Sequence, residues 1–364
     1  MKDPTPRMEV FSQLSASDHE LVLFCHDSAT GLRAIIAVHN TALGPSLGGL
    51  RMWNYASEQE ALFDVLRLAR GMTYKSAVAG LSLGGGKAVI LGDSRAHKTE
   101  ALLRRFGQFV NDLGGKYITA EDVGIGTSDI ETIRRETPHV AGLADRSGDP
   151  SPFTAFGVWL SIKAAMKRVM GQDDLSGRSV MVQGTGNVGL ELVKLLRRDG
   201  AKVLAHDVND ASLKAAIEAG AQAVSGDAVH SAAVDVYAPC ALGASLNPST
   251  IPKLRCSVVA GAANNQLLDE ARDGQALHDR GILYVPDFVA NAGGIINISL
   301  EKTGVYCHDR AMMLTGNIYD TVTHLFATCD CDRVLPQQAA MGLAKKRLRE
   351  AGNPRSLGRS DLQS

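Results

Sequence analysis

The sequence predicts an α/β protein built from two domains, and three observations lead to this prediction. Its 364 residues are enough for two separate hydrophobic cores. The segment DRSGDPSPF, rich in Gly, Pro, Ser and Asp, interrupts the hydrophobic pattern near residue 150. Beyond it strands and helices alternate, which is typical of a parallel sheet wound on both faces. We expect a first domain over residues 1–148, a second over 149–335, and a C-terminal helix within 336–364 that packs back on the first domain.

Two apolar runs open the first domain. ELVLF and LRAIIAVHN flank the turn-like segment SATG, which predicts an early hairpin. Ser57 and Glu60 form a capping box, and the apolar residues behind them recur at helical spacing to about Gly71. This helix would present Lys75 at its carboxyl end. KAVILGD then predicts a buried strand that begins at Lys87.

Lys87 follows three glycines, residues 84–86, in a run that also contains Lys75. Burying an ammonium group is costly unless an anion or a reacting group lies against it, so the two lysines indicate small-molecule chemistry. A phosphate-binding loop is excluded, because the glycine spacing is one residue too long and Ala88 stands where Ser or Thr would bind magnesium. Taken alone, Lys87 is equally consistent with a surface lysine beside a flexible turn.

Two acidic residues follow the next short strand, which lies in KYITAEDVG. Glu121 and Asp122 stand directly after it, and Ser128 with Glu131 predicts the cap of the following helix. A carboxylate at a strand end reaches a lysine on a neighbouring strand, so either acid is a candidate proton-transfer partner for Lys87. Either acid is also consistent with a solvated loop charge.

The second domain begins its alternation with the strand SVMVQ, the turn GTGNVG and the helix LELVKLLRRDG, which Gly200 ends. The strand KVLAHD and the helix ASLKAAIEAG follow. Three later apolar runs, VDVYA, SVVAG and ILYVP, continue the series. Such a parallel sheet binds its ligands at the carboxyl ends of the strands.

The turn after the first of these strands matches the pattern G-x-G-x-x-G. Its residues are Gly184, Thr185, Gly186, Asn187, Val188 and Gly189. Asp207 follows 23 residues after Gly184, at the end of the next strand. This context predicts dinucleotide binding, with the glycines against the pyrophosphate and the carboxylate on the adenosine ribose. Asp207 would repel a 2′-phosphate and residues 208–210 offer no arginine to hold one, which favours NAD over NADP.

Composition excludes several other classes of protein. The net charge is -1 and no long run of one sign occurs, so neither nucleic acid nor a membrane surface is an expected partner. The start of the chain lacks the apolar core of a signal peptide, and no apolar stretch reaches the roughly 18 residues of a membrane span, so we expect a cytoplasmic protein. The six cysteines match neither a disulfide framework nor a zinc spacing, and we expect no metal site.

Nine segments, taken together and in order, resemble the Glu/Leu/Phe/Val amino acid dehydrogenase superfamily and are closest to its leucine dehydrogenases. They are GPSLGG, RMW, RGMTYK, GLSLGGGKAVI, TAEDVG, QGTGNVG, APCALGA, GAANNQL and PDFVANAGGIIN. The resemblance implies NAD-dependent, reversible oxidative deamination of an L-amino acid to a 2-oxo acid and ammonia. It also implies an N-terminal substrate domain, a Rossmann doubly wound NAD-binding domain, an active-site cleft between them, and a homo-oligomer of two to eight chains.

The resemblance assigns the catalytic roles to two residues of the first domain. Lys87 would activate the attacking water and Asp122 would move protons to and from the amino group. Lys75 would pair with the substrate carboxylate, and Gly48 and Gly49 would let the substrate lie close to backbone. Like charge and burial both lower the pKa of a lysine, so Lys87 is expected to act as a neutral base while Lys75 stays paired.

The resemblance also implies the residues that contact the substrate side chain and the cofactor. Met72, Ala120, Ile295 and Ile298 are expected around the substrate, together with Asn265 or Asn264 between the amino group and the nicotinamide. The remaining expected cofactor contacts are Thr154, Val208, Ala238, Cys240, Ala260, Ala262, Asn264 and Asn291. No charged residue occupies the expected pocket, which disfavours glutamate and favours leucine, valine and isoleucine.

Three alternatives stay open at this point. Phenylalanine or tryptophan is a second candidate substrate within the same family, because Asp149 and its surroundings also resemble those enzymes. A hydroxy-acid dehydrogenase would need a catalytic histidine, and neither His139 nor His206 is well placed for that role. A non-catalytic NAD-binding sensor or structural oligomer would not need the set Lys75, Lys87 and Asp122.

Overall fold

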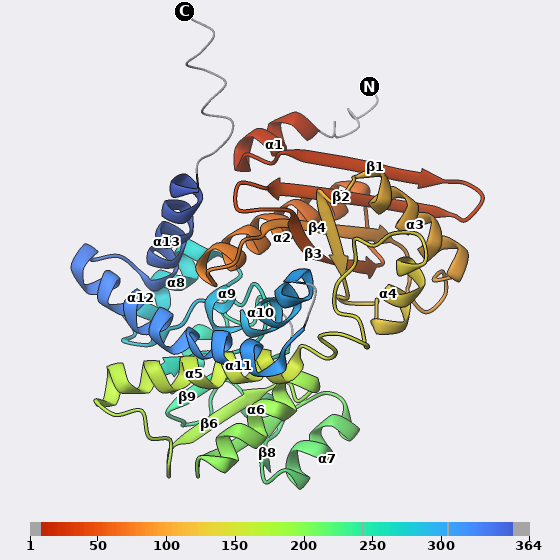
Figure 1. Ribbon diagram of the computed structural model, residues 1–364. Coiled ribbons are helices and arrows are strands. Elements are labelled where there is room, and N and C mark those ends of the chain that lie inside the picture. Colours follow the sequence, from red (N-terminus) through yellow and green to blue (C-terminus); the bar gives the residue numbers. More distant parts are fainter. Residues whose placement is uncertain (1–8, 242, 304–305, 352–364) are drawn as a thin grey trace, which may run out of the picture. The chain divides into compact units, whose positions relative to one another are not determined.

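The computed structural model describes residues 9–241, 243–303 and 306–351. The chain forms two compact units (Figure 1). The first unit contains Met1–Gly148 together with Ala344–Ser364, and the second contains Asp149–Leu343. The described part of the chain contains no helix that is both long and apolar enough to cross a membrane.

A five-stranded sheet in the order β1-β2-β4-β3-β5 forms the centre of the first unit. The strands are β1 (Leu21–Asp27), β2 (Leu32–Asn40), β3 (Ser46–Trp53), β4 (Gly84–Leu91) and β5 (Tyr117–Ala120). β1 and β2 form the expected hairpin, and β2 is antiparallel to β4. β3 is parallel to both β4 and β5, so that the carboxyl ends of these three strands point the same way.

Helices cover both faces of this sheet. They are α1 (Val10–Ser17), α2 (Glu58–Val78), α3 (Glu100–Asp112), α4 (Thr127–Arg134) and the last part of α13 (Pro336–Glu350). Because side chains alternate along a strand, Ala37 and Val89 pack on α2, while Ile36 and Ile90 pack on the opposite core with Phe106 of α3. Arg347 of α13 donates to the carbonyl oxygens of Ala77 (2.8 Å) and Leu81 (3.3 Å) at the end of α2.

Two expected boundaries in this unit are wrong. α2 continues to Val78 instead of ending near Gly71, because one glycine costs a helix only about 1 kcal/mol and the residues behind it are buried. Lys75 therefore lies within the last turn of the helix. α4 begins at Thr127 and is capped through the Asp129 carboxylate, which accepts from the Gly126 amide (2.8 Å), instead of through Ser128 and Glu131.

The second unit is built on a six-stranded parallel sheet in the order β11-β10-β9-β6-β7-β8. The strands are β6 (Ser179–Gln183), β7 (Lys202–His206), β8 (Gln222–Ala223), β9 (Val236–Pro239), β10 (Val258–Val259) and β11 (Leu283–Tyr284). The order reverses between β6 and β9, which are direct neighbours. This is the doubly wound arrangement that the sequence predicts, and such sheets bind ligands at the reversal point.

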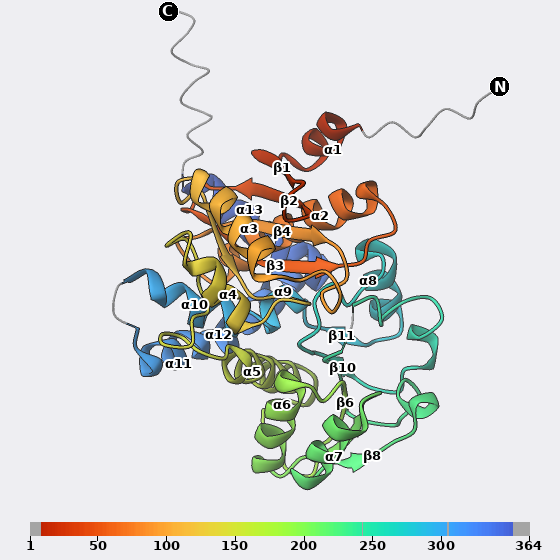
Figure 2. The same cartoon turned by 90° about the vertical axis from the view of Figure 1, so that its right-hand side faces the viewer.

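Eight α-helices lie entirely in the described part of the second unit, which also contains the first part of α13. They are α5 (Ser151–Met170), α6 (Asn187–Arg198), α7 (Asp210–Glu218), α8 (Glu270–Asp279), α9 (Asp287–Ala290), α10 (Gly293–Ser299), α11 (His308–Gly316) and α12 (Ile318–Asp332). α6 and α7 lie beside the strands β6 and β8 (Figure 2), and α5 packs against α6, α10 and α12. α5 begins directly after Pro150, so the last three residues of the segment DRSGDPSPF open a long helix.

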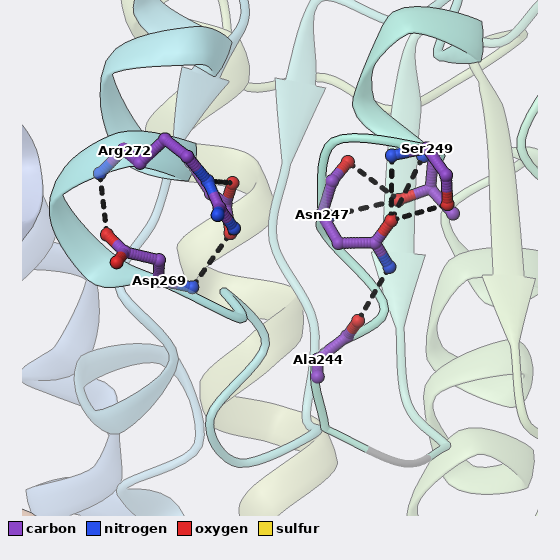
Figure 3. A network of polar contacts seen from close by, with 7 residues as sticks. Ala244, Asn247, Ser249, Asp269 and Arg272 are labelled. Atoms are coloured by element: carbon purple, nitrogen blue, oxygen red, sulfur yellow. Dashed lines mark hydrogen bonds and ion pairs between the residues drawn. The ribbon is translucent and has the colours of Figure 1, made fainter.

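Side-chain hydrogen bonds hold the loop after β9 in place (Figure 3). Asn247 donates to the Ala244 carbonyl (2.9 Å) and accepts from the Ser249 amide (2.9 Å). Nearby, Asp269 caps α8 by accepting from the Arg272 amide (2.8 Å). These bonds satisfy backbone groups that the ends of the neighbouring elements leave open.

Phe106→Ala tests the core of the first unit. It removes a fully buried ring and should lower the free energy of unfolding of that unit by about 3–5 kcal/mol. The chain has two tryptophans, one in each unit, so Trp53 fluorescence in a Trp159→Phe background follows urea unfolding of the first unit alone. Phe63→Ala, at a ring that is 62% exposed, is the control and should change that energy by less than about 0.5 kcal/mol. Equal effects of the two substitutions would contradict the assignment of the core.

Candidate active site

The three glycines before Lys87 allow two elements to approach β4 closely. A Cβ atom on Gly85 would lie 2.0 Å from the Thr73 backbone nitrogen of α2, and one on Gly86 would lie 2.8 Å from the Tyr117 ring on the other face. Lys87 follows on the same face as Gly85, and its residue surface is only 5% exposed. Close packing of α2 and Tyr117 on β4 therefore requires these glycines. The same packing places Lys87 in the interior beside α2.

Lys87 contacts Asp122, which follows β5. The Lys87 ammonium lies 3.1 Å from Oδ2 of Asp122. Glu121 does not make this contact and instead accepts a hydrogen bond from the Thr127 hydroxyl (3.0 Å). Of the two acids that the sequence leaves open, Asp122 is the one that the structure brings to Lys87.

Gly48 and Gly49 of β3 lie beside this pair. A Cβ atom on Gly48 would lie 1.7 Å from the Gly86 carbonyl oxygen. A Cβ atom on Gly49 would lie 2.8 Å from Cβ of Asp122. The packing of the protein itself thus requires both glycines, and their contact with a substrate stays a prediction.

Arg51 of β3 is the charged residue of this site that the sequence analysis did not identify. Its Nε donates to Oδ2 of Asp122 (2.9 Å) and its Nη1 donates to Oδ2 of Asp64 in α2 (3.0 Å). The Tyr55 hydroxyl donates to the same Asp64 oxygen (2.6 Å). Because strand side chains repeat every second residue, Gly49 and Arg51 share a face, and recognising RMW as part of a strand would have shown this.

Burial and charge act against each other on Lys87 and Asp122. Burial lowers the pKa of Lys87, and this effect together with the Arg51 charge exceeds the opposing attraction of Asp122. Burial alone would raise the pKa of Asp122, but Lys87 and Arg51 outweigh it and hold the pKa of that carboxyl below its ordinary value. The arrangement favours an ionised carboxylate beside an amine that loses its proton more readily than a free lysine.

The other predicted substrate residues are divided between the two units. Met72 and Lys75 are half-buried in the last turns of α2, on either side of Thr73, which packs on Gly85. Ala120 is buried at the end of β5. Ile295 and Ile298 are buried in α10 of the second unit, 6% and 8% exposed, one turn apart on the helix.

The G-x-G-x-x-G residues connect β6 to α6 as expected. Gly184 has φ 94°, a left-handed conformation that glycine adopts without strain. A Cβ atom on Gly189 would lie 2.0 Å from the Gly184 carbonyl oxygen, whereas one on Gly186 meets no atom within 4 Å. Gly186 thus leaves open space at the N-terminus of α6, where a phosphate group is stabilised by backbone amides and the helix dipole.

Asp207 lies beside this turn. Its Oδ2 accepts from the Thr185 amide (2.6 Å) and its Oδ1 accepts from the Asn209 amide (2.8 Å). Val208 is 95% exposed, which is consistent with a residue at the rim of a ligand site. The helix N-terminus, the open position at Gly186 and a fixed carboxylate 23 residues after Gly184 fit the pyrophosphate and ribose of a dinucleotide.

The remaining expected cofactor residues lie in or after β9, after β10, in α5 and after α9. Ala238 is in β9, and Cys240, whose pKa burial raises to about 12, follows it directly. Ala260 follows β10. Asn291, after α9, donates to the Ala262 carbonyl oxygen (3.0 Å) and to Oδ1 of Asn264 (2.9 Å).

Asn265 has φ 52°, a left-handed conformation rare for residues with a side chain. Thr154, in the first turn of α5, donates to the Pro150 carbonyl oxygen (3.0 Å). The described residues contain no group of three or more His, Cys, Asp or Glu side chains arranged to hold a metal ion.

Family models match both units. The model described as Glu/Leu/Phe/Val dehydrogenase, dimerisation domain, matches residues 19–139. The model described as Glutamate/Leucine/Phenylalanine/Valine dehydrogenase matches residues 147–212 and 206–329. Together the matches cover most of the chain and both candidate sites.

Individual proteins give the same result. A leucine dehydrogenase of Geobacillus stearothermophilus is 48% identical over 353 residues, which is 96% of each chain. The crystal structure of L-tryptophan dehydrogenase from Nostoc punctiforme has a TM-score of 0.81 and 42% identity, and covers 94% of this chain and 100% of that one. The hetero-hexameric glutamate dehydrogenase of Thermus thermophilus, at 21% identity and TM-score 0.79 over 98% and 99% of the two chains, shares the fold.

Two substitutions in the glycine turn separate its packing role from its ligand role. Gly189→Ala should lower the melting temperature of the second unit by several degrees, because its new Cβ would collide with the Gly184 carbonyl. Gly186→Ala should leave the melting temperature unchanged and weaken NADH binding, because its Cβ enters the open space. Thermal unfolding and titration of NADH fluorescence measure the two effects. Unchanged NADH binding by Gly186→Ala would show that no phosphate lies at this position.

Proposed function

Because this chain belongs to the Glu/Leu/Phe/Val dehydrogenase family, we propose that it deaminates L-leucine and related aliphatic L-amino acids oxidatively and reversibly, with NAD as the cofactor. The chain is an amino acid dehydrogenase, and the proposal concerns its substrate, its cofactor and the roles of its residues. The single observation that carries it is the buried contact between Lys87 of β4 and Asp122 in the loop after β5, 3.1 Å apart.

In this proposal Lys87 is the base that activates water. A lysine acts as a base only when it is neutral, and the lowered pKa of Lys87 brings its neutral form closer to working pH. Asp122, kept ionised by its two cationic neighbours, exchanges protons with the substrate amino group. Lys75 pairs with the substrate carboxylate and fixes the α-carbon relative to the two other groups.

NAD supplies the hydride acceptor when it is bound. Gly186 and the N-terminus of α6 hold its pyrophosphate, and Asp207 accepts hydrogen bonds from its adenosine ribose. The same carboxylate disfavours a 2′-phosphate by charge repulsion, which supports NAD over NADP. The other proposed cofactor contacts lie on the elements already described. They are Thr154, Val208, Ala238, Cys240, Ala260, Ala262, Asn264 and Asn291.

The substrate side chain is proposed to contact Met72, Ala120, Ile295 and Ile298, none of which carries a charge. Such residues select an apolar side chain, and a difference of one methylene changes binding by only about 1–3 kcal/mol, so valine and isoleucine should also react. Phenylalanine or tryptophan is the second candidate, because an L-tryptophan dehydrogenase shares 42% identity over nearly the whole chain. We also propose a homo-oligomer, since the N-terminal family model is described as a dimerisation domain.

Single lysine substitutions test the proposed roles. Lys87→Ala should lower kcat by about 10²–10⁴-fold because the base is lost, with NADH binding unchanged. Lys75→Ala should raise the KM of the amino acid by about 10- to 100-fold, as expected for a lost charged hydrogen bond. Lys116→Ala, at an exposed lysine just before β5, is the control and should leave both constants within about twofold. Loss of NADH binding in both site variants would contradict the assignment.

A substrate panel tests the proposed reaction. NADH absorbance at alkaline pH, with leucine, valine, isoleucine, phenylalanine, tryptophan and glutamate, should give the highest kcat/KM with leucine and none with glutamate. NAD should be preferred over NADP by at least about 100-fold, which corresponds to about 2.7 kcal/mol of charge repulsion. A preference for an aromatic amino acid would favour the second candidate. Reaction with a hydroxy acid alone would contradict the proposal.

A further inference from the structure

Asp122 receives both of its cationic partners on one oxygen. Arg51 Nε lies 2.9 Å and Lys87 Nζ lies 3.1 Å from Oδ2. Among the described residues, no cation is bonded to Oδ1, and the Asp122 side chain is 17% exposed. The carboxylate is thus fixed in orientation through one oxygen, and the other stays open to an incoming group.

Arg51 is itself held from the opposite side. Its Nη1 donates to Asp64 of α2, and the Tyr55 hydroxyl bonds to the same Asp64 oxygen. A guanidinium group presents several donors in a rigid plane, which suits it to bridging two carboxylates in fixed directions. Arg51 therefore connects β3 to α2 and to the end of β5, the three elements that surround Lys87.

The four charges of this cluster explain why a second cation is needed. With Lys87 protonated, two positive charges face the negative charges of Asp122 and Asp64. If Arg51 were absent, loss of the Lys87 proton would leave Asp122 as a buried carboxylate without a cationic partner, which is strongly unfavourable. Arg51 does not titrate in the working range, so it neutralises Asp122 in both protonation states of Lys87.

We propose that Arg51 is a positioning residue of the deamination reaction: it holds Asp122 ionised with Oδ1 directed to the reacting nitrogen, and it allows Lys87 to release its proton. The inference rests on the proposed function for its role in turnover. The groups that face Lys87 are Asp122 from the loop after β5, Arg51 from β3 and Asp64 from α2, and Tyr55 contacts Asp64. Glu121 is bonded to Thr127 and Lys75 lies further along α2.

Arg51→Met tests the role in turnover, because methionine keeps the apolar stem and removes the charge. Lys87 should then hold its proton more strongly, because the repelling charge of Arg51 is gone while Asp122 and Asp64 remain. The activity of oxidative deamination should rise with pH as Lys87 deprotonates. The acidic limb of kcat should therefore move up by at least about one pH unit, with kcat at least tenfold lower below that limb and KM for the amino acid within about threefold.

Two further variants separate positioning from general structural damage. Arg51→Lys retains the charge and should bring the acidic limb back toward its original position. Arg33→Met is the matched control, because Arg33 of β2 pairs with Glu58 of α2 (2.6 Å) just as Arg51 of β3 pairs with Asp64, but at an exposed site. It should leave kcat and the pH profile unchanged. Thermal unfolding and NADH binding confirm that each variant is folded.

A second measurement does not depend on turnover. The pH dependence of Lys87 reductive methylation, followed by peptide mass spectrometry, reports the neutral amine directly, and Arg51→Met should shift it to higher pH. If Arg51→Met is unstable, Asp64→Asn should give a smaller loss of kcat with the KM unchanged.

An unchanged methylation profile in a folded Arg51→Met protein would overturn the inference. So would a higher KM with unchanged kcat, which would place Arg51 on the substrate. Inactivity of the original protein on every amino acid would count against the proposed function alone, and methylation would still decide this inference.

Discussion

The first unit depends on keeping charges in its interior neutralised. Lys87, Asp122, Arg51 and Asp64 come from four separate segments, and Arg51 joins the Lys87–Asp122 pair to Asp64. The glycines at positions 48, 49 and 84–86 are what bring these segments close enough, since a Cβ atom at any of them would collide with a neighbouring element. The sheet and α2 therefore pack closely around this ion cluster, and removing one of its members would leave a buried charge unpaired.

The candidate dinucleotide site of the second unit is formed mainly by backbone groups and contains one charged side chain, Asp207. The turn at Gly184, the N-terminus of α6 and the reversal between β6 and β9 offer amide groups and open space, and Asp207 is already fixed by two backbone amides. Groups that are fixed before a ligand arrives lose less entropy on binding, which fits the proposed dinucleotide site. The two candidate sites thus differ in kind: buried charged side chains lie in the first unit, and backbone amides at a helix N-terminus lie in the second.

The sequence predicted the parts whose signals are local. G-x-G-x-x-G between a strand and a helix, and the hydrophobic alternation around it, were sufficient to predict the fold of the second unit, which the structure and the family matches confirm. Arg51 was not predicted, because its importance depends on Asp64 and Asp122, 13 and 71 residues away in the chain. The end of α2 was placed too early because Gly71 was given more weight than the buried residues that follow it. Patterns in a single sequence do not show contacts between distant segments. They also do not show where packing outweighs the helix propensity of one residue.

Cys240 has a consequence for how the protein handles oxidants. Its thiol follows β9, at the edge where the dinucleotide is expected, and its pKa of about 12 keeps it fully protonated at physiological pH. Peroxides and alkylating reagents react with the nucleophilic thiolate and hardly with the thiol. A sulfur atom at this strand end therefore stays a thiol, reacts slowly with such reagents and adds no negative charge where the dinucleotide is expected.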